Sequence, residues 1–125
     1  MTRTRSRRSA KTAGTRFEAS IANALATALD DDRIERRAKS GAKDRGDISG
    51  LRSYGRRIVA EAKDYGGRFL IGEWLTEAEI ERGNDDASAA VVIAKRRGHG
   101  NPLDQAVICT LRDLIVLLGG ERCDS

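Results

Sequence analysis

Residues 57–63 alternate between two kinds of side chain, as is typical of a β-strand. The even-numbered positions carry Ile or Ala, and the odd-numbered positions are mostly charged. Glu61 and Lys63 therefore share one face of this predicted strand. Residues 47–51 are expected to form the preceding antiparallel strand, with a turn at 53–55 between the two. This hairpin would bring residue 47 opposite residue 61 or 62.

The remaining pattern predicts further strands and three helices. Apolar residues recur at helical spacing over residues 14–29, 69–82 and 111–118. Residues 89–95 consist of six consecutive apolar residues and Lys95, a pattern typical of a central strand that is covered on both faces. Residues 33–38 and 106–109 are shorter strand candidates. The order of elements predicts an α/β fold, in which a mixed five-stranded sheet is flanked by helices.

Two helices carry specific expectations. Thr110 is a favourable N-cap for the last helix, which is apolar almost all round. A small domain has no second surface to cover such a helix, so we expect a homodimer through residues 111–118, with Trp74 nearby. Trp74 itself is more typical of a core residue than of a base-stacking residue.

Length and charge define the organisation of the chain. The 125 residues are enough for one domain, which we place at 14–120, and no apolar run is long enough for a membrane span. Residues 1–16 hold six basic residues and no acid, whereas the net charge of the whole chain is only +4. Residues 1–13 are therefore interpreted as a basic, flexible arm and residues 121–125 as a tail. Two cysteines without a disulfide framework suit a reducing cytoplasm.

Three side chains at the predicted hairpin suggest hydrolytic chemistry. Asp47 and Glu61 are two carboxylates that would converge beside the Lys63 amine. Mg²⁺ is usually held by one or two carboxylates, with water and phosphate oxygens completing its shell. The pattern therefore favours metal-assisted hydrolysis of a phosphodiester. A surface strand with a cross-strand ion pair is the simpler alternative for Glu61 and Lys63.

At these residues the chain resembles the PD-(D/E)xK nuclease superfamily. The matching segments are Gly41-Ala42-Lys43-Asp44-Arg45-Gly46-Asp47-Ile48 and Glu61-Ala62-Lys63, and the resemblance spans roughly residues 14–118. Within the superfamily the chain looks most like the archaeal and phage-type Holliday-junction resolvases, in which the first helix carries a further acid that Glu18 would supply. Gly46 stands where the name of the superfamily has Pro.

The resemblance implies a restriction-endonuclease-like core and a set of site residues. Asp47, Glu61, the backbone carbonyl of Ala62 and, directly or through water, Glu18 would hold Mg²⁺, with Mn²⁺ as a substitute. Lys63 would orient the attacking water or stabilise charge. The alternative for Glu18 is an ordinary rim glutamate paired with Arg16 or Arg33.

The expected partner is DNA, branched according to the resemblance, in the cytoplasm of a bacterium, an archaeon or a phage-infected cell. The basic residues expected to contact its phosphates are Arg3, Arg5, Arg7, Arg8, Lys11, Arg16, Lys39, Lys43, Arg45, Arg96 and Arg97. Two other functions stay open: a nuclease of the same fold that acts on duplex, flap or single-stranded DNA, and a DNA-binding protein without catalysis.

Other chemistry finds less support in the sequence. The single histidine, His99, lies in a glycine-flanked loop, and with two cysteines fourteen residues apart it does not form a zinc motif. No G-x-x-x-x-G-K-[ST] motif is present, which argues against nucleotide hydrolysis. The acids at 30–32 are interpreted as a turn that ends the first helix.

Overall fold

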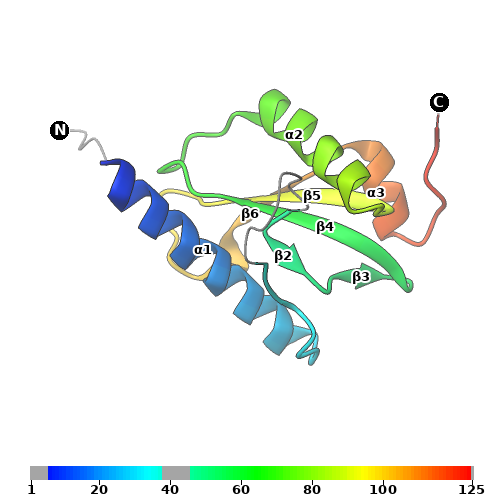
Figure 1. The fold of residues 1–125 in the computed structure, drawn as a ribbon, viewed down its shortest axis with the longest axis horizontal. Coiled ribbons are helices and arrows are strands. Elements are labelled where there is room, and N and C mark those ends of the chain that lie inside the picture. The colour runs from blue at the N-terminus through cyan, green and yellow to red at the C-terminus, as the bar shows by residue number, and fades with distance from the viewer. Residues whose placement is uncertain (1–5, 38–45, 125) are drawn as a thin grey trace.

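The computed structural model describes residues 6–37 and 46–124, and in this part of the chain α-helices cover both faces of a mixed β-sheet (Figure 1). The elements in chain order are α1 (Arg7–Ala28), β1 (Glu35–Arg36), β2 (Ile48–Ser49), β3 (Arg52–Ser53), β4 (Arg56–Lys63), α2 (Ile71–Asn84), β5 (Ala89–Ala94), the 3-10 helix η1 (Pro102–Asp104), β6 (Ala106–Ile108) and α3 (Leu111–Leu117). The predicted α/β class is confirmed. None of the helices described is long and apolar enough to cross a membrane.

The sheet has six strands, whereas the sequence predicted five. The strands follow the order β1-β2-β4-β5-β6; β4 and β5 are parallel and the other neighbours are antiparallel. The additional strand, β3, pairs only with the start of β4. Tyr54 and Gly55 join these two strands, and both have positive φ angles, 52° and 74°. Two such residues match the twist of a tight hairpin. This turn explains why β4 is already paired at Arg56, one residue before the strand predicted at 57–63.

The alternation along β4 separates two hydrophobic clusters. Ile58 and Ala60 pack with Phe17 and Ile21 of α1, on the face that also carries α3. Val59 packs with Trp74 on the opposite face, which α2 covers. Every residue of β5 is buried, as its apolar run predicted for a central strand. Glu61 and Lys63 follow Val59 at every second position and therefore lie on the α2 side of the sheet.

The first helix begins at Arg7, seven residues before the predicted start. Ser6 is its N-cap, and the Ser6 hydroxyl accepts a hydrogen bond from the Ser9 N–H at 3.1 Å. Residues 7–13 consist of Arg, Ala, Lys, Ser and Thr without Pro or Gly, so nothing in them stops a helix. Part of the expected arm is thus a helical extension of the domain, while residues 1–5 lie outside the described chain.

Trp74 is 1% exposed and lies in the core, as predicted. The dimer contact that was expected near Trp74 stays a prediction. Thr110 is the N-cap of α3, again as predicted, and its hydroxyl accepts from the Asp113 N–H at 3.2 Å. In α3, Val116 is fully buried and belongs to the hydrophobic cluster between α1 and the sheet, whereas Leu111 and Leu118 are each 72% exposed.

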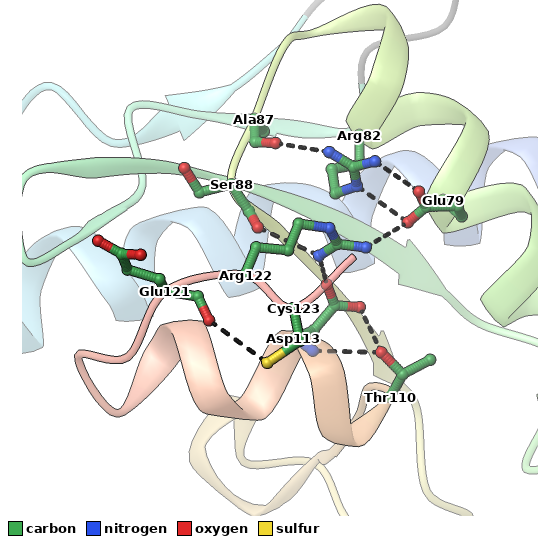
Figure 2. Close-up of polar contacts among 9 residues, drawn as sticks. All are labelled: Glu79, Arg82, Ala87, Ser88, Thr110, Asp113, Glu121, Arg122 and Cys123. Carbon is green, nitrogen blue, oxygen red and sulfur yellow. Dashed lines mark hydrogen bonds and ion pairs between the residues drawn. The ribbon is translucent and has the colours of Figure 1, made fainter. Parts of the chain in front are cut away.

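A polar network attaches the C-terminal segment to the domain (Figure 2). Arg122 contacts the Asp113 carboxylate at 2.5 Å, the Ser88 carbonyl at 3.2 Å and the Glu79 carboxylate at 3.0 Å. Asp113 is 4% exposed and also accepts from the Thr110 hydroxyl at 2.9 Å. Residue 122, which the sequence assigned to a tail, therefore joins α2, α3 and the segment before β5.

Candidate functional site

Asp47 lies beside the carboxyl end of β4, as the predicted hairpin required. Ile48 is paired with Ala60, which places position 47 next to Glu61 and Ala62. One carboxylate oxygen of Asp47, Oδ2, accepts the backbone N–H of Ala62 at 2.9 Å. Ile48 belongs to the α1-side cluster, so the side chain of its neighbour Asp47 faces the α2 side together with Glu61.

Both carboxylates are removed from solvent. Asp47 is 3% exposed and Glu61 is 6% exposed. Ionised carboxylates are costly to bury unless hydrogen bonds, cations or metal ions compensate them. Their burial, with Asp47 directly before β2 and Glu61 in β4, differs from the exposed position of a carboxylate on a solvated surface strand.

Gly46, directly before Asp47, has a backbone conformation that few other residues adopt. Its φ is +92°, and a Cβ atom there would lie 2.7 Å from the Val59 Cγ1. Proline fixes φ near −65° and cannot adopt this conformation. The residue that departs from the superfamily motif is thus the one that this backbone path requires.

Lys63 lies between two glutamates. Its Nζ is 2.7 Å from Oε2 of Glu77 on α2 and 3.5 Å from Oε1 of Glu61. Burial by itself disfavours the ammonium ion, but the Glu77 hydrogen bond and the charges of both glutamates outweigh that effect and raise the pKa of Lys63 above its ordinary value. The side chain is therefore a cation at neutral pH, suited to holding a water molecule or a phosphate oxygen and unsuited to removing a proton.

Glu18 lies apart from this group, on α1, which packs on the other face of the sheet. Its carboxylate accepts from Arg36 Nε at 2.9 Å. Glu18 thus forms an ion pair, as the alternative interpretation expected, but its partner is Arg36 and neither Arg16 nor Arg33. Arg33 is bound instead to Asp31 at 2.8 Å, and this hydrogen bonding lowers the pKa of Asp31 to about 2.

The expected DNA contacts fall in two described regions. Arg7, Arg8, Lys11 and Arg16 are exposed on the first half of α1. Arg96 and Arg97 are exposed in the loop after β5, where the Arg97 Nε donates to the Gly66 carbonyl at 3.2 Å. The remaining residues of that prediction, Arg3, Arg5, Lys39, Lys43 and Arg45, lie outside the described residues.

Sequence reasoning missed the positions of two glutamates of α2 relative to the site. Glu77 contacts Lys63, and Glu81 is 5% exposed. They follow Trp74 by three and seven residues, a spacing that puts all three side chains on the same face of a helix. The predicted core position of Trp74 therefore indicated that Glu77 and Glu81 lie on the same side of α2.

No group of three or more His, Cys, Asp or Glu side chains within 6–37 and 46–124 is arranged to hold a metal ion.

No family model matches the chain, and neither a curated protein nor a solved structure matches it.

Proposed function

We propose that this protein is a Mg²⁺-dependent endodeoxyribonuclease with a restriction-endonuclease-like core, which hydrolyses phosphodiester bonds in branched DNA in the manner of a Holliday-junction resolvase. The observation that carries the proposal is the pair of buried carboxylates at the β2–β4 pairing: Asp47 directly before β2, and Glu61 of β4 beside the Lys63 ammonium. The motif resemblance supplies the substrate class, and the geometry of these residues supports the chemistry.

The residues present fit a hard divalent cation. Asp47 and Glu61 offer carboxylate oxygens on one side of the sheet, and two carboxylates are a common protein contribution to a Mg²⁺ site. The carbonyl of Ala62, the residue directly after Glu61, adds a further oxygen. Glu18, expected as a further ligand, is bonded to Arg36 on the α1 side of the sheet, so the ligand set proposed here consists of Asp47, Glu61 and the Ala62 carbonyl.

A Mg²⁺ or Mn²⁺ ion held by Asp47, Glu61 and the Ala62 carbonyl would lower the pKa of a coordinated water and neutralise charge on the phosphate. The chain performs the remaining tasks. Lys63 holds the attacking water or a phosphate oxygen through its ammonium group, and Glu77 fixes the direction of that group. Burial of the carboxylates keeps bulk water from weakening these electrostatic interactions.

The DNA backbone is bound by the exposed basic residues. The first half of α1 presents Arg7, Arg8, Lys11 and Arg16 before its first acid, Glu18. Such a group of exposed cations binds phosphates without regard to sequence. This suits an enzyme that recognises the shape of a branch.

The enzyme is expected to form a homodimer through α3, because resolution of a junction needs two catalytic sites. Leu111, Leu114 and Leu118 are 72%, 40% and 72% exposed, and their spacing places them on one side of the helix. Sedimentation at micromolar concentration should show a dimer that Leu118→Glu dissociates. Leu103→Glu is the matched control, since Leu103 is 71% exposed on η1. A strictly monomeric wild-type protein, with and without junction DNA, would favour a nuclease with a single site.

Cleavage assays on four DNA structures test the function directly. Junction, flap, single-stranded and duplex DNA of matched sequence are incubated side by side with Mg²⁺, Mn²⁺ or EDTA. The expected result is metal-dependent cleavage with junction DNA as the preferred substrate. Preference for another structure would assign the protein to the wider nuclease class, and DNA binding without any cleavage would support a non-catalytic DNA-binding protein.

A further inference from the structure

An aromatic cluster lies directly beyond the carboxyl end of β4. The ring of Tyr65 meets the edge of Trp74 with centroids 5.2 Å apart and planes at 76°, and the ring of Phe69 lies 5.9 Å from Trp74. Trp74 is buried, whereas Tyr65 is 46% exposed and Phe69 is 38% exposed. The buried indole thus supports two rings that remain accessible. Three of the five aromatic residues in the chain gather here.

This cluster adjoins the candidate catalytic residues. The Lys63 Nζ lies 5.9 Å from the centroid of the Tyr65 ring, within the range of a cation–π contact. Lys63 also contacts Glu61 at 3.5 Å. A group placed against Tyr65 would therefore lie next to the position where a phosphate would meet the carboxylates.

Cations border the same surface. Arg68 is exposed within the loop that carries Tyr65. This loop lies beside the loop after β5, and the Arg97 Nε bonds to the Gly66 carbonyl at 3.2 Å (Figure 1). The contact is close: a Cβ atom on Gly67, whose φ is +96°, would lie 2.8 Å from the Arg97 Cβ. The packing of Gly67 therefore holds Arg97 against the loop that carries Tyr65.

We infer that Tyr65 and Phe69 form a stacking platform for an unpaired nucleobase, with Arg68 and Arg97 binding the adjoining phosphates. The inference rests on the proposed function and extends it, because it names the feature of DNA that is recognised beside the site. Aromatic rings bordered by cations are the combination with which proteins bind single strands, since every base offers a π face whatever the sequence. Paired bases in a duplex are stacked on their neighbours and are not available. The platform therefore favours DNA in which a nucleotide is unstacked near the scissile phosphate, as at a branch or a flap.

Binding in EDTA tests this platform apart from cleavage. The full chain is titrated with an oligothymidylate strand and, separately, with a blunt duplex. Tyr65→Leu should weaken single-strand binding about tenfold, within the range that base–aromatic stacking supplies, and leave duplex binding unchanged. Tyr65→Phe should retain the affinity because the ring is kept. The fluorescence of Trp74, the only tryptophan, should change on binding of the single strand to the wild-type protein.

Tyr54→Leu is the matched control, because Tyr54 is 75% exposed at the other end of β4 and should not affect either ligand. Phe69→Leu provides a second test if Tyr65→Leu does not fold. Single-strand binding that withstands both leucine substitutions would overturn the inference, as would an equal loss for single strand and duplex. Wild-type protein that binds through Tyr65 but cleaves no DNA with Mg²⁺ would refute the proposed function and leave the platform in place.

Discussion

Asp47→Asn is expected to slow Mg²⁺-dependent DNA cleavage by about 10²–10³-fold while leaving the protein folded. Asparagine keeps an oxygen that can accept the Ala62 N–H, which Asp47 now bonds at 2.9 Å, but it removes the negative charge that would hold the cation. Loss of one preorganised electrostatic group costs about 10²–10³ in rate in well-studied sites. Single-turnover cleavage of junction DNA measures the effect, and DNA binding in EDTA should not be weakened.

Glu61→Gln and Lys63→Met should cause losses of the same order. Glu73→Gln is the matched control, because Glu73 is an exposed glutamate on α2 and makes no proposed contact with the site. Turnover near the wild-type rate in folded Asp47→Asn protein would remove this residue from the mechanism. It would also leave its burial as a purely structural feature.

The second large effect is expected for stability. Arg122→Ala should lower the free energy of unfolding by roughly 3 kcal/mol, the lower end of the cost of removing one partner of a buried ion pair. The reason is that Asp113, only 4% exposed, would lose its 2.5 Å contact with a cation. Chemical denaturation followed by circular dichroism measures the change. Arg112→Ala, at an exposed position of α3, should stay within about 0.5 kcal/mol of wild type.

A double-mutant cycle separates the ion pair from other effects of the substitution. Asp113→Asn combined with Arg122→Ala should destabilise the protein by clearly less than the two single changes together, since the second change no longer strands a buried charge. Additive losses would show that Arg122 acts through the Ser88 carbonyl and Glu79 instead.

Arg82 holds the pKa of Glu79 below its ordinary value. The ionised Glu79 therefore contributes to the free energy of unfolding at neutral pH, and this contribution is lost as the pH falls through the lowered pKa.

Local sequence was sufficient to predict features that depend on a single residue or on a regular spacing of apolar residues. The alternation in β4 determined which side chains share a face, because successive residues of a strand point in opposite directions. The unbroken apolar run at 89–94 determined a buried central strand, and Thr110 determined the start of α3, because its hydroxyl can accept from a backbone N–H three residues later. The hairpin that brings Asp47 to Ala62 also followed from local pattern and turn position.

Tertiary structure alone decided which charged groups meet. Glu18 had several arginines within reach in sequence, and the packing of α1 on β1 selected Arg36. Glu77 met Lys63 because α2 returns along β4, and Arg122 met Asp113 because the chain after α3 folds back toward α2. The aromatic cluster likewise required the loop after β4 to fold over Trp74. Long polar side chains have many rotamers and many possible partners, so their pairing follows from the arrangement of the backbone and is not encoded in local periodicity.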